Sequence, residues 1–312
     1  MKLRDAGEYE ILFDLSEGEY QRTEVGGIRT RTIRAGESLE VECYPLTRIG
    51  GAARTEARRR QNDFMLEVNR RITEKKIRRL IEQNFTTEDW VLTLTYDYGA
   101  VDKFRRWGNE AQMTALGIPE DDRDVKRDLK NYWRRIKREM SAHGEDAAEF
   151  KHIWKVESTK GDTQYHAHVV VHAPGLTREE LQRLWPYGAI TADNLRLGDG
   201  GAAGLARYLS KRGQMERADE SGSRIRRWGH SKNLKEPRVT VSDRKVSRRR
   251  AQLVAEDVQR NGREIFEALY PGYQAIEVTV KFSGFVAGAY IFARLRKIDT
   301  EPPWVRKGRR QE

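Results

Sequence analysis

The clearest hydrophobic pattern lies in the middle of the chain. Residues 90–96 (WVLTLTY) are apolar and β-branched, and two more strand-like runs, 150–157 and 165–172, flank the turn-rich segment STKGDTQ. Between the first strand and this hairpin, apolar side chains over 119–140 recur at steps of four, four, three and four, as in an amphipathic helix. They are Val125, Leu129, Trp133, Ile136 and Met140. The pattern predicts a strand, a helix and a β-hairpin, in that order.

A second group of elements follows the hairpin. Thr177 and Glu180 form a capping-box pattern that opens a short helix through Trp185. A strand is expected over 189–197, and a glycine-rich segment then leads into a helix carrying ARYLSKR, residues 206–212. The order strand, helix, hairpin, helix, strand, helix predicts an α+β fold, with a central antiparallel sheet and helices packed on one face.

Both ends of the chain have weaker patterns. Residues 1–50 mix short apolar pieces with glycine and charge and give no assignable element, whereas 52–84 contains neither proline nor glycine and predicts a long helix. Between Arg54 and Arg79 this helix carries ten basic residues against four acidic ones, so it presents either a solvated face or a DNA-contacting one. Near the C-terminus, 276–296 alternates in strand fashion.

These shifts in pattern predict three parts: a helical N-terminal arm over 1–85, a central domain over 86–215 and a basic C-terminal extension over 216–312. Residues 224–250 hold eleven Lys and Arg against two acidic residues, which suits either an exposed charged linker or a segment that follows a DNA backbone.

The overall composition narrows the class of protein. The 312 residues carry 59 Lys and Arg against 48 Asp and Glu, a net charge of +11 that suits a polyanionic partner. The single cysteine, Cys43, excludes a disulfide framework and a cysteine-rich zinc site. Because the first residues lack an apolar signal core and no apolar run approaches the roughly 20 residues of a membrane span, we expect a cytoplasmic protein, in a bacterium or its host, with no membrane partner.

The strongest chemical signal is the sequence YHAHVVV at 165–171. Alternate side chains of a strand share a face, so His166 and His168 point the same way, roughly 6.6 Å apart along the backbone, and can chelate one divalent ion. Glu157 ends the preceding strand, and a hairpin that pairs it with His166 brings the carboxylate to the same face. We expect His152 to face away, and His172 to lie too far along the strand to join them. One carboxylate and two imidazoles leave coordination positions open, as a catalytic metal site requires.

A tyrosine nucleophile is the second chemical signal. On a helix, Tyr208 and Lys211 share a face because they are three residues apart. A phenol is a poor nucleophile at neutral pH unless a cation or a metal supports the phenolate, and Lys211 can supply that charge or bind the phosphate. A tyrosine and a lysine at this spacing also occur on ordinary helix surfaces. The pair therefore indicates a nucleophile only in combination with the other motifs of the chain.

Taken together, the three motifs resemble those of the HUH endonucleases, named for two histidines flanking a hydrophobic residue. VLTLTY at 91–96, YHAHVVV at 165–171 and RYLSK at 207–211 stand in the family order, and the sequence is most similar to rolling-circle replication proteins of phages and plasmids. The resemblance implies a palm-like fold whose topology is like that of RNA-recognition modules. Some relatives carry a second tyrosine one turn later, but here Arg212 stands in its place, so a single-tyrosine enzyme is expected.

The resemblance also implies a reaction. His166, His168 and Glu157 would hold Mg²⁺ or Mn²⁺, and Tyr208, helped by Lys211, would cut single-stranded DNA at a replication origin or hairpin. The products would be a 5′-phosphotyrosine and a free 3′-OH. A host polymerase and helicase are the expected partners, and no small-molecule cofactor is expected. The candidate DNA contacts are Arg207, Arg224, Arg226 and Arg227, with Trp228 available for stacking on a base.

Four other functions share parts of this pattern. A relaxase or a transposase of a mobile element would use the same residues, although the chain has no GxxxxGK[ST] phosphate loop of a fused helicase. A non-catalytic nucleic-acid-binding module could have a sheet of this topology. A metal-dependent hydrolase would activate water instead of the tyrosine and leave no covalent adduct.

Overall fold

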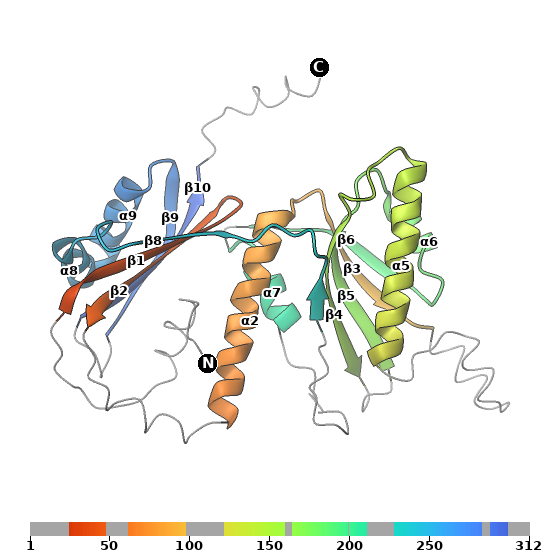
Figure 1. Ribbon diagram of the computed structural model, residues 1–312, viewed down its shortest axis with the longest axis horizontal. Helices are drawn as coiled ribbons and strands as arrows, with labels where there is room; N and C mark the ends of the chain where they lie inside the picture. Colours follow the sequence, from red (N-terminus) through yellow and green to blue (C-terminus); the bar gives the residue numbers. More distant parts are fainter. Residues whose placement is uncertain are drawn as a thin grey trace, which may run out of the picture. The chain divides into compact units, whose positions relative to one another are not determined.

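The chain folds into two compact units (Figure 1), which are described separately. The central unit comprises Asn84–Lys235, and the terminal unit combines Met1–Gln83 with Glu236–Glu312. The computed structural model describes residues 25–47, 62–97, 122–159, 164–198, 200–210, 228–282 and 288–298. The expected functional division of the chain into 1–85, 86–215 and 216–312 stays a prediction.

The central unit is built on one antiparallel sheet with the strand order β6-β3-β5-β4-β7. Its elements along the chain are β3 (Trp90–Thr95), α5 (Asp122–Ala142), β4 (Lys151–Thr159), β5 (Gln164–His172), α6 (Arg178–Arg183), β6 (Ile190–Asn194), α7 (Ala203–Ser210) and β7 (Trp228–His230). The predicted α+β class, with a central antiparallel sheet and helices packed on it, is confirmed, but the helices lie on both faces of the sheet and not on one.

One face of this sheet forms the hydrophobic core with α5. The helix places its apolar positions toward the sheet, and Leu129, Ile136 and Met140 are almost completely buried. α6 begins as the sequence predicts, because Thr177 and Glu180 close a reciprocal capping box. This face therefore supplies stability and leaves the other face of the sheet for α7 and the polar side chains.

The opposite face of the sheet is in contact with α7. A hollow of about 170 Å³ lies between them, and it is lined by side chains of β3, β5 and α7. The lining includes Val91, Thr93, His168, Leu205 and Tyr208. Residues of all three sequence motifs thus lie together at one place in the central unit.

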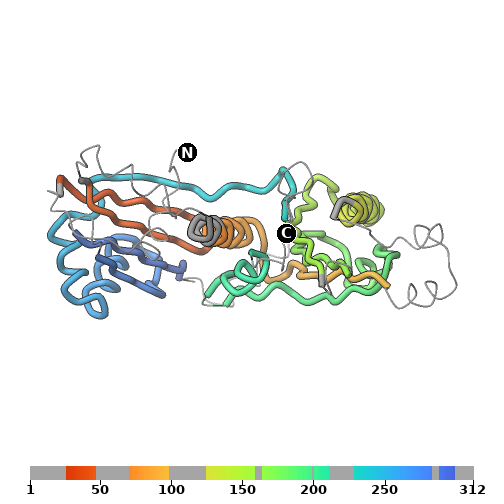
Figure 2. Tube along the Cα trace, turned by 90° about the horizontal axis from the view of Figure 1, so that it is seen from below, coloured from red at the N-terminus to blue at the C-terminus, as the bar shows by residue number. Residues whose placement is uncertain are grey.

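The terminal unit contains a second antiparallel sheet, with the order β8-β1-β2-β10-β9, of which the sequence pattern indicated only the strand-like region 276–296. Strands from the two ends of the chain lie side by side in it (Figure 2). Its elements are β1 (Val25–Ala35), β2 (Ser38–Thr47), α2 (Asn62–Asn84), β8 (Arg238–Ser242), α8 (Arg248–Glu256), the π-helical turn η3 (Val258–Gly262), α9 (Arg263–Leu269), β9 (Tyr273–Phe282) and β10 (Ala289–Lys297). The N-terminal region is therefore a strand pair followed by a helix, and not only a helical arm.

The two faces of this second sheet differ in chemistry. One face packs Leu39, Val41 and Ile291 against Phe266 and its neighbours on α8 and α9. The intervening residues of β2, Glu40 and Glu42, point to the other face, where they are also buried. Burial of carboxylates requires partners, and these come from α2 and β1.

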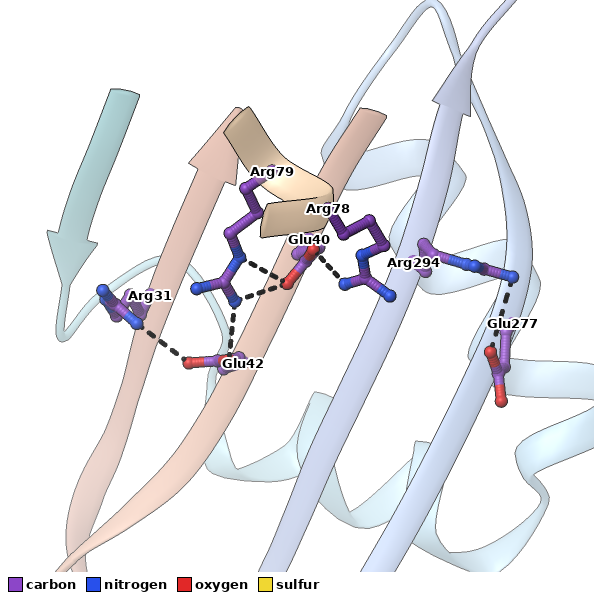
Figure 3. Close-up of polar contacts among 7 residues, drawn as sticks. All are labelled: Arg31, Glu40, Glu42, Arg78, Arg79, Glu277 and Arg294. Carbon is purple, nitrogen blue, oxygen red and sulfur yellow. Dashed lines mark hydrogen bonds and ion pairs between the residues drawn. The ribbon is translucent and has the colours of Figure 1, made fainter. Parts of the chain in front are cut away.

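Arginines of α2 and β1 pair with these buried carboxylates (Figure 3). Glu40 accepts hydrogen bonds from Arg78 and Arg79, and the nearest Arg79 nitrogen lies 2.6 Å from the carboxylate. Arg31 reaches Glu42 at 3.3 Å. Two of the basic residues of the predicted helix are thus ion-paired and largely buried, which leaves them unsuited to DNA contact.

The turn between β1 and β2 depends on a glycine. Gly36 has a φ of 57°, which lies in the left-handed region, and a Cβ built there would lie 2.1 Å from the carbonyl oxygen of Glu82 near the end of α2. Its amide donates a hydrogen bond of 3.2 Å to Gln83. Only glycine allows the turn to approach the helix this closely.

No helix within the described part of the chain is both long and apolar enough to cross a membrane.

Candidate metal centre and nucleophile

The register of the β4–β5 hairpin gathers the candidate metal ligands on the face that contacts α7. Glu157 pairs directly with His166, as the sequence predicts, and Lys155 pairs with His168. The two imidazole rings stand edge to face, with their centroids 4.9 Å apart. This local arrangement follows from strand alternation alone.

Glu157, His166 and His168 can converge on one ion. Their ligand atoms all lie within 4.8 Å of one another. The Oε2 atom of Glu157 is 3.3 Å from Nε2 of His166 and 3.5 Å from Nε2 of His168. Three protein ligands of mixed oxygen and nitrogen character fit a divalent cation with open coordination positions, although they do not identify the ion.

Glu157 is held in its charged form. Burial by itself raises the pKa of this carboxyl, but hydrogen bonds from His166, His168 and Lys155 outweigh burial and hold the pKa well below its usual range. The carboxylate therefore remains ionised, as a metal ligand must be.

His168 is fixed from both sides of its ring. Its Nδ1 atom lies 3.1 Å from the hydroxyl of Thr93 on β3. Its Nε2 atom lies 2.7 Å from the hydroxyl of Tyr208 on α7. A partner on Nδ1 orients the ring and leaves Nε2 directed toward Glu157 and the phenol, which is the usual way in which a ligand histidine is positioned.

Tyr208 lies at the edge of the candidate metal group. Its ring centroid is 4.6 Å from that of His168, and the residue is 41% exposed, so the phenol is accessible to a large substrate. Partial burial raises the pKa of the phenol, and the negative charge of Glu157 raises it further. Nucleophilic attack by this oxygen would therefore require a nearby cation, either a side chain or a metal ion, to stabilise the phenolate.

The sequence motifs missed one functional-looking residue, Lys155. It is only 4% exposed, and its ammonium forms an ion pair with Glu157 and donates a hydrogen bond of 3.2 Å to the carbonyl of Tyr208. The signal was present in the sequence, because Lys155 precedes Glu157 by two residues and must share its face of the strand.

The other predicted residues have varied positions. Lys211, Arg224, Arg226 and Arg227 lie outside the described residues, and Arg207 is exposed on α7. His152 stacks on Trp133 of α5, at a centroid distance of 4.4 Å, so it faces away from the site as expected. His172 shares the face of the other histidines but pairs with Asp89 at 2.7 Å.

A second group with metal-like spacing, Glu139, His143 and Glu180, is already used for structure. Glu180 closes the capping box of α6 and lies 2.9 Å from His143, while Glu139 pairs with Arg183. These carboxylates are occupied by contacts that hold α6 against α5.

The motif order and the geometry of the central unit are consistent with the HUH type, in which two histidines of a central strand lie beside a tyrosine of a later helix. Residues 89–213 match the family model of the replication-associated protein ORF2, a family of rolling-circle replication initiators. The matched region includes all three motifs but less than half of the chain, and it confirms the resemblance and supports a role in replication initiation. No curated protein and no solved structure matches the chain.

Proposed function

We propose that this protein initiates rolling-circle replication by nicking one DNA strand with Tyr208, in a reaction that depends on a divalent metal. The observation that carries the proposal is the 2.7 Å contact between the Tyr208 hydroxyl and His168, one of three residues with converging ligand atoms. A nucleophile within one hydrogen bond of a candidate metal group has the proximity that phosphoryl transfer requires.

The proposed step is a transesterification. The Tyr208 oxygen attacks a backbone phosphorus, and the bond between that phosphorus and the 3′ oxygen breaks. The phenol loses a proton and the departing 3′ oxygen gains one, so the products are a 5′-phosphotyrosine and a free 3′-OH. Because one ester replaces another, the energy of the bond is kept for rejoining the strand, and the 3′-OH can prime a polymerase.

Glu157, His166 and His168 would hold the metal, for which we propose Mg²⁺ or Mn²⁺. When bound, the ion would supply charge that polarises a non-bridging phosphate oxygen. The chain itself positions the nucleophile, through α7, and the ligands, through the hairpin. Thr93 holds the orientation of His168.

The proposed substrate is single-stranded DNA, or a hairpin extruded at the origin, because the nucleophile must reach the phosphate of an accessible strand. Arg207 is exposed beside Tyr208 and suits a phosphate contact. Lys211, Arg224, Arg226 and Arg227 remain predicted contacts or helpers. A polymerase and a helicase of the host are the proposed partners, and no small-molecule cofactor is required.

The proposal is tested by incubating the protein with Mn²⁺ and labelled single-stranded oligonucleotides from its own replicon, followed by denaturing gels. A shifted protein–DNA band is expected for the wild type and for Tyr273→Phe, a control in the terminal unit, but not for Tyr208→Phe. Cleavage that survives Tyr208→Phe would instead indicate water-based hydrolysis. Binding without cleavage, across several candidate origins, would indicate a binding module.

A further inference from the structure

Lys155 is an unusual residue for the middle of a sheet. A lysine is almost never buried unless it is paired, and this one is 4% exposed. Two of its polar contacts lead in different directions, one to Glu157 on its own strand and one to the main chain of Tyr208 on α7. It therefore joins the candidate metal group to the helix that carries the candidate nucleophile.

The contact with Glu157 divides the carboxylate between two tasks. Oε1 pairs with the ammonium of Lys155, whereas Oε2 faces the Nε2 atoms of His166 and His168. The lysine thus fixes the rotation of the carboxylate without occupying the oxygen that lies nearest the imidazoles. Contacts of this kind, made to the ligand and not to the ion, fix the orientation of a metal ligand.

The contact with α7 stabilises a short helix at its C-terminal end. α7 has eight residues, too few to be stable by itself, so contacts with the sheet must hold it in place. The carbonyl of Tyr208 belongs to the last turn, where carbonyls lack partners within the helix and a cation is favourable. Lys155 supplies that cation from the sheet, 3.2 Å from the carbonyl oxygen.

At hydrogen-bond distance, Lys155 contacts Glu157 and the main chain of Tyr208. Its ammonium also lies 6.0 Å from the centroid of the Tyr208 ring, at the outer limit of a cation–π contact, and its burial keeps it from the DNA backbone. We therefore expect its main effect to pass through Glu157 and the main chain of α7. Misplacement of a reacting group by about 1 Å can cost roughly 100-fold in rate, so such a bridge has a large effect on the reaction.

We propose that Lys155 is a positioning residue, whose bridge between Glu157 and the Tyr208 carbonyl sets the distance between the nucleophile and the metal group. The proposal rests on the proposed function. It gives this buried lysine of β4 a role separate from that of Lys211, the phenolate helper predicted from the motif.

The test compares Lys155→Met, which keeps most of the length of the side chain and removes its charge, with Lys155→Arg and with Lys151→Met, a control on the same face of β4. In single turnovers at saturating DNA and Mn²⁺, Lys155→Met should form the covalent adduct roughly 10- to 100-fold more slowly. Lys155→Arg should recover most of this loss, and Lys151→Met should match the wild type. Single-stranded DNA affinity without metal should change less than about twofold, because the buried lysine is not expected to reach DNA.

Mn²⁺ affinity, measured by electron paramagnetic resonance without DNA, separates positioning from support of the metal. Lys155→Met should bind Mn²⁺ within a few-fold of the wild type, because removal of a neighbouring like charge offsets loss of the contact that orients Glu157. If the rate of Lys155→Met falls only at subsaturating Mn²⁺, or if the rate is unchanged, the positioning role is wrong. Should Lys155→Met fail to fold, Lys155→Gln, which is polar but uncharged and one bond too short to make both contacts, must show the same slow adduct formation.

The two proposals fail in different ways. A wild-type protein that forms no Tyr208-dependent adduct would overturn the proposed function. A normal wild-type adduct, together with an undiminished rate in Lys155→Met, would overturn only the role of Lys155.

Discussion

His168 connects three parts of the candidate site through one ring. Thr93 contacts Nδ1, and Tyr208 and Glu157 lie near Nε2. A free imidazole can present either nitrogen, and rotation of the ring would remove the ligand from the group. The threonine hydroxyl is therefore as much a part of the site as the histidine that it orients.

Substitution Thr93→Val should weaken Mn²⁺ binding about tenfold, because the change removes the hydroxyl that orients His168 and keeps the shape of the side chain. Titration of free Mn²⁺ by electron paramagnetic resonance measures the effect. Thr191→Val, at the exposed position opposite Thr93 on β6, is the matched control and should leave the affinity unchanged. Equal affinities for Thr93→Val and the control would show that His168 needs no partner on Nδ1.

At the scale of elements, the central hairpin was predictable because its information is local. Alternation places Glu157, His166 and His168 on one face, and a short turn fixes their register. Lys155 obeys the same alternation, but no family motif drew attention to it. The position of α7 on the sheet depends on tertiary contacts, which the sequence pattern does not contain.

The second sheet as a whole could not be predicted from the sequence, because one of its strands buries charged residues and because its strands are far apart in the sequence. In β2 the residues between Leu39 and Cys43 include two buried glutamates, so the expected alternation of apolar and exposed polar positions is absent. The strand also pairs with β10, about 250 residues later, which no local pattern can reveal. Ion pairs with α2 replace the apolar contacts that a sequence pattern would have detected.

The ion pairs between α2 and β2 predict a pH-dependent stability. Burial raises the pKa of Glu40, but Arg79 and Arg78 outweigh it and hold the pKa well below its usual range. Glu40→Gln should lower the free energy of unfolding at pH 7 by about 3 kcal/mol, because it leaves two arginines without their carboxylate. The contribution of a depressed pKa is present above the ordinary glutamate value, roughly 4.3, and is lost as pH falls toward the folded value. The difference between wild type and variant should therefore narrow in acid.

Urea unfolding at pH 7 and at about pH 3.5 measures this difference. Burial raises the pKa of Glu42, which acts in the opposite sense, but that contribution is shared by both proteins and largely cancels. Glu37→Gln removes an exposed pair with Arg296 and should change stability by less than about 1 kcal/mol at either pH. A difference for Glu40→Gln that does not vary with pH would contradict the ion-pair account.

At the scale of the whole molecule, the net charge of +11 is distributed unevenly. The arginines Arg31, Arg78 and Arg79 are largely buried and paired with glutamates. By contrast, the consecutive arginines 248–250 of α8 are exposed, and their side chains have no ion pair among the described residues. Part of the positive charge counted in the composition is therefore unavailable to a polyanion.

The arginines of α8 are electrostatically unfavourable for the helix that carries them. Arg248, Arg249 and Arg250 occupy its first turn, where the helix dipole disfavours cations, and Ser247 caps that turn. Replacing all three with alanine should raise stability, on the order of 1 kcal/mol. If they contact phosphates, the same change should reduce the slope of log affinity against log salt concentration for single-stranded DNA by about 2. Binding of Tyr208→Phe without metal, measured from 50 to 300 mM salt, isolates this term from cleavage. Greater stability with an unchanged slope would assign these charges to solvent, whereas greater stability with a smaller slope would show that α8 gives up stability for contact with DNA.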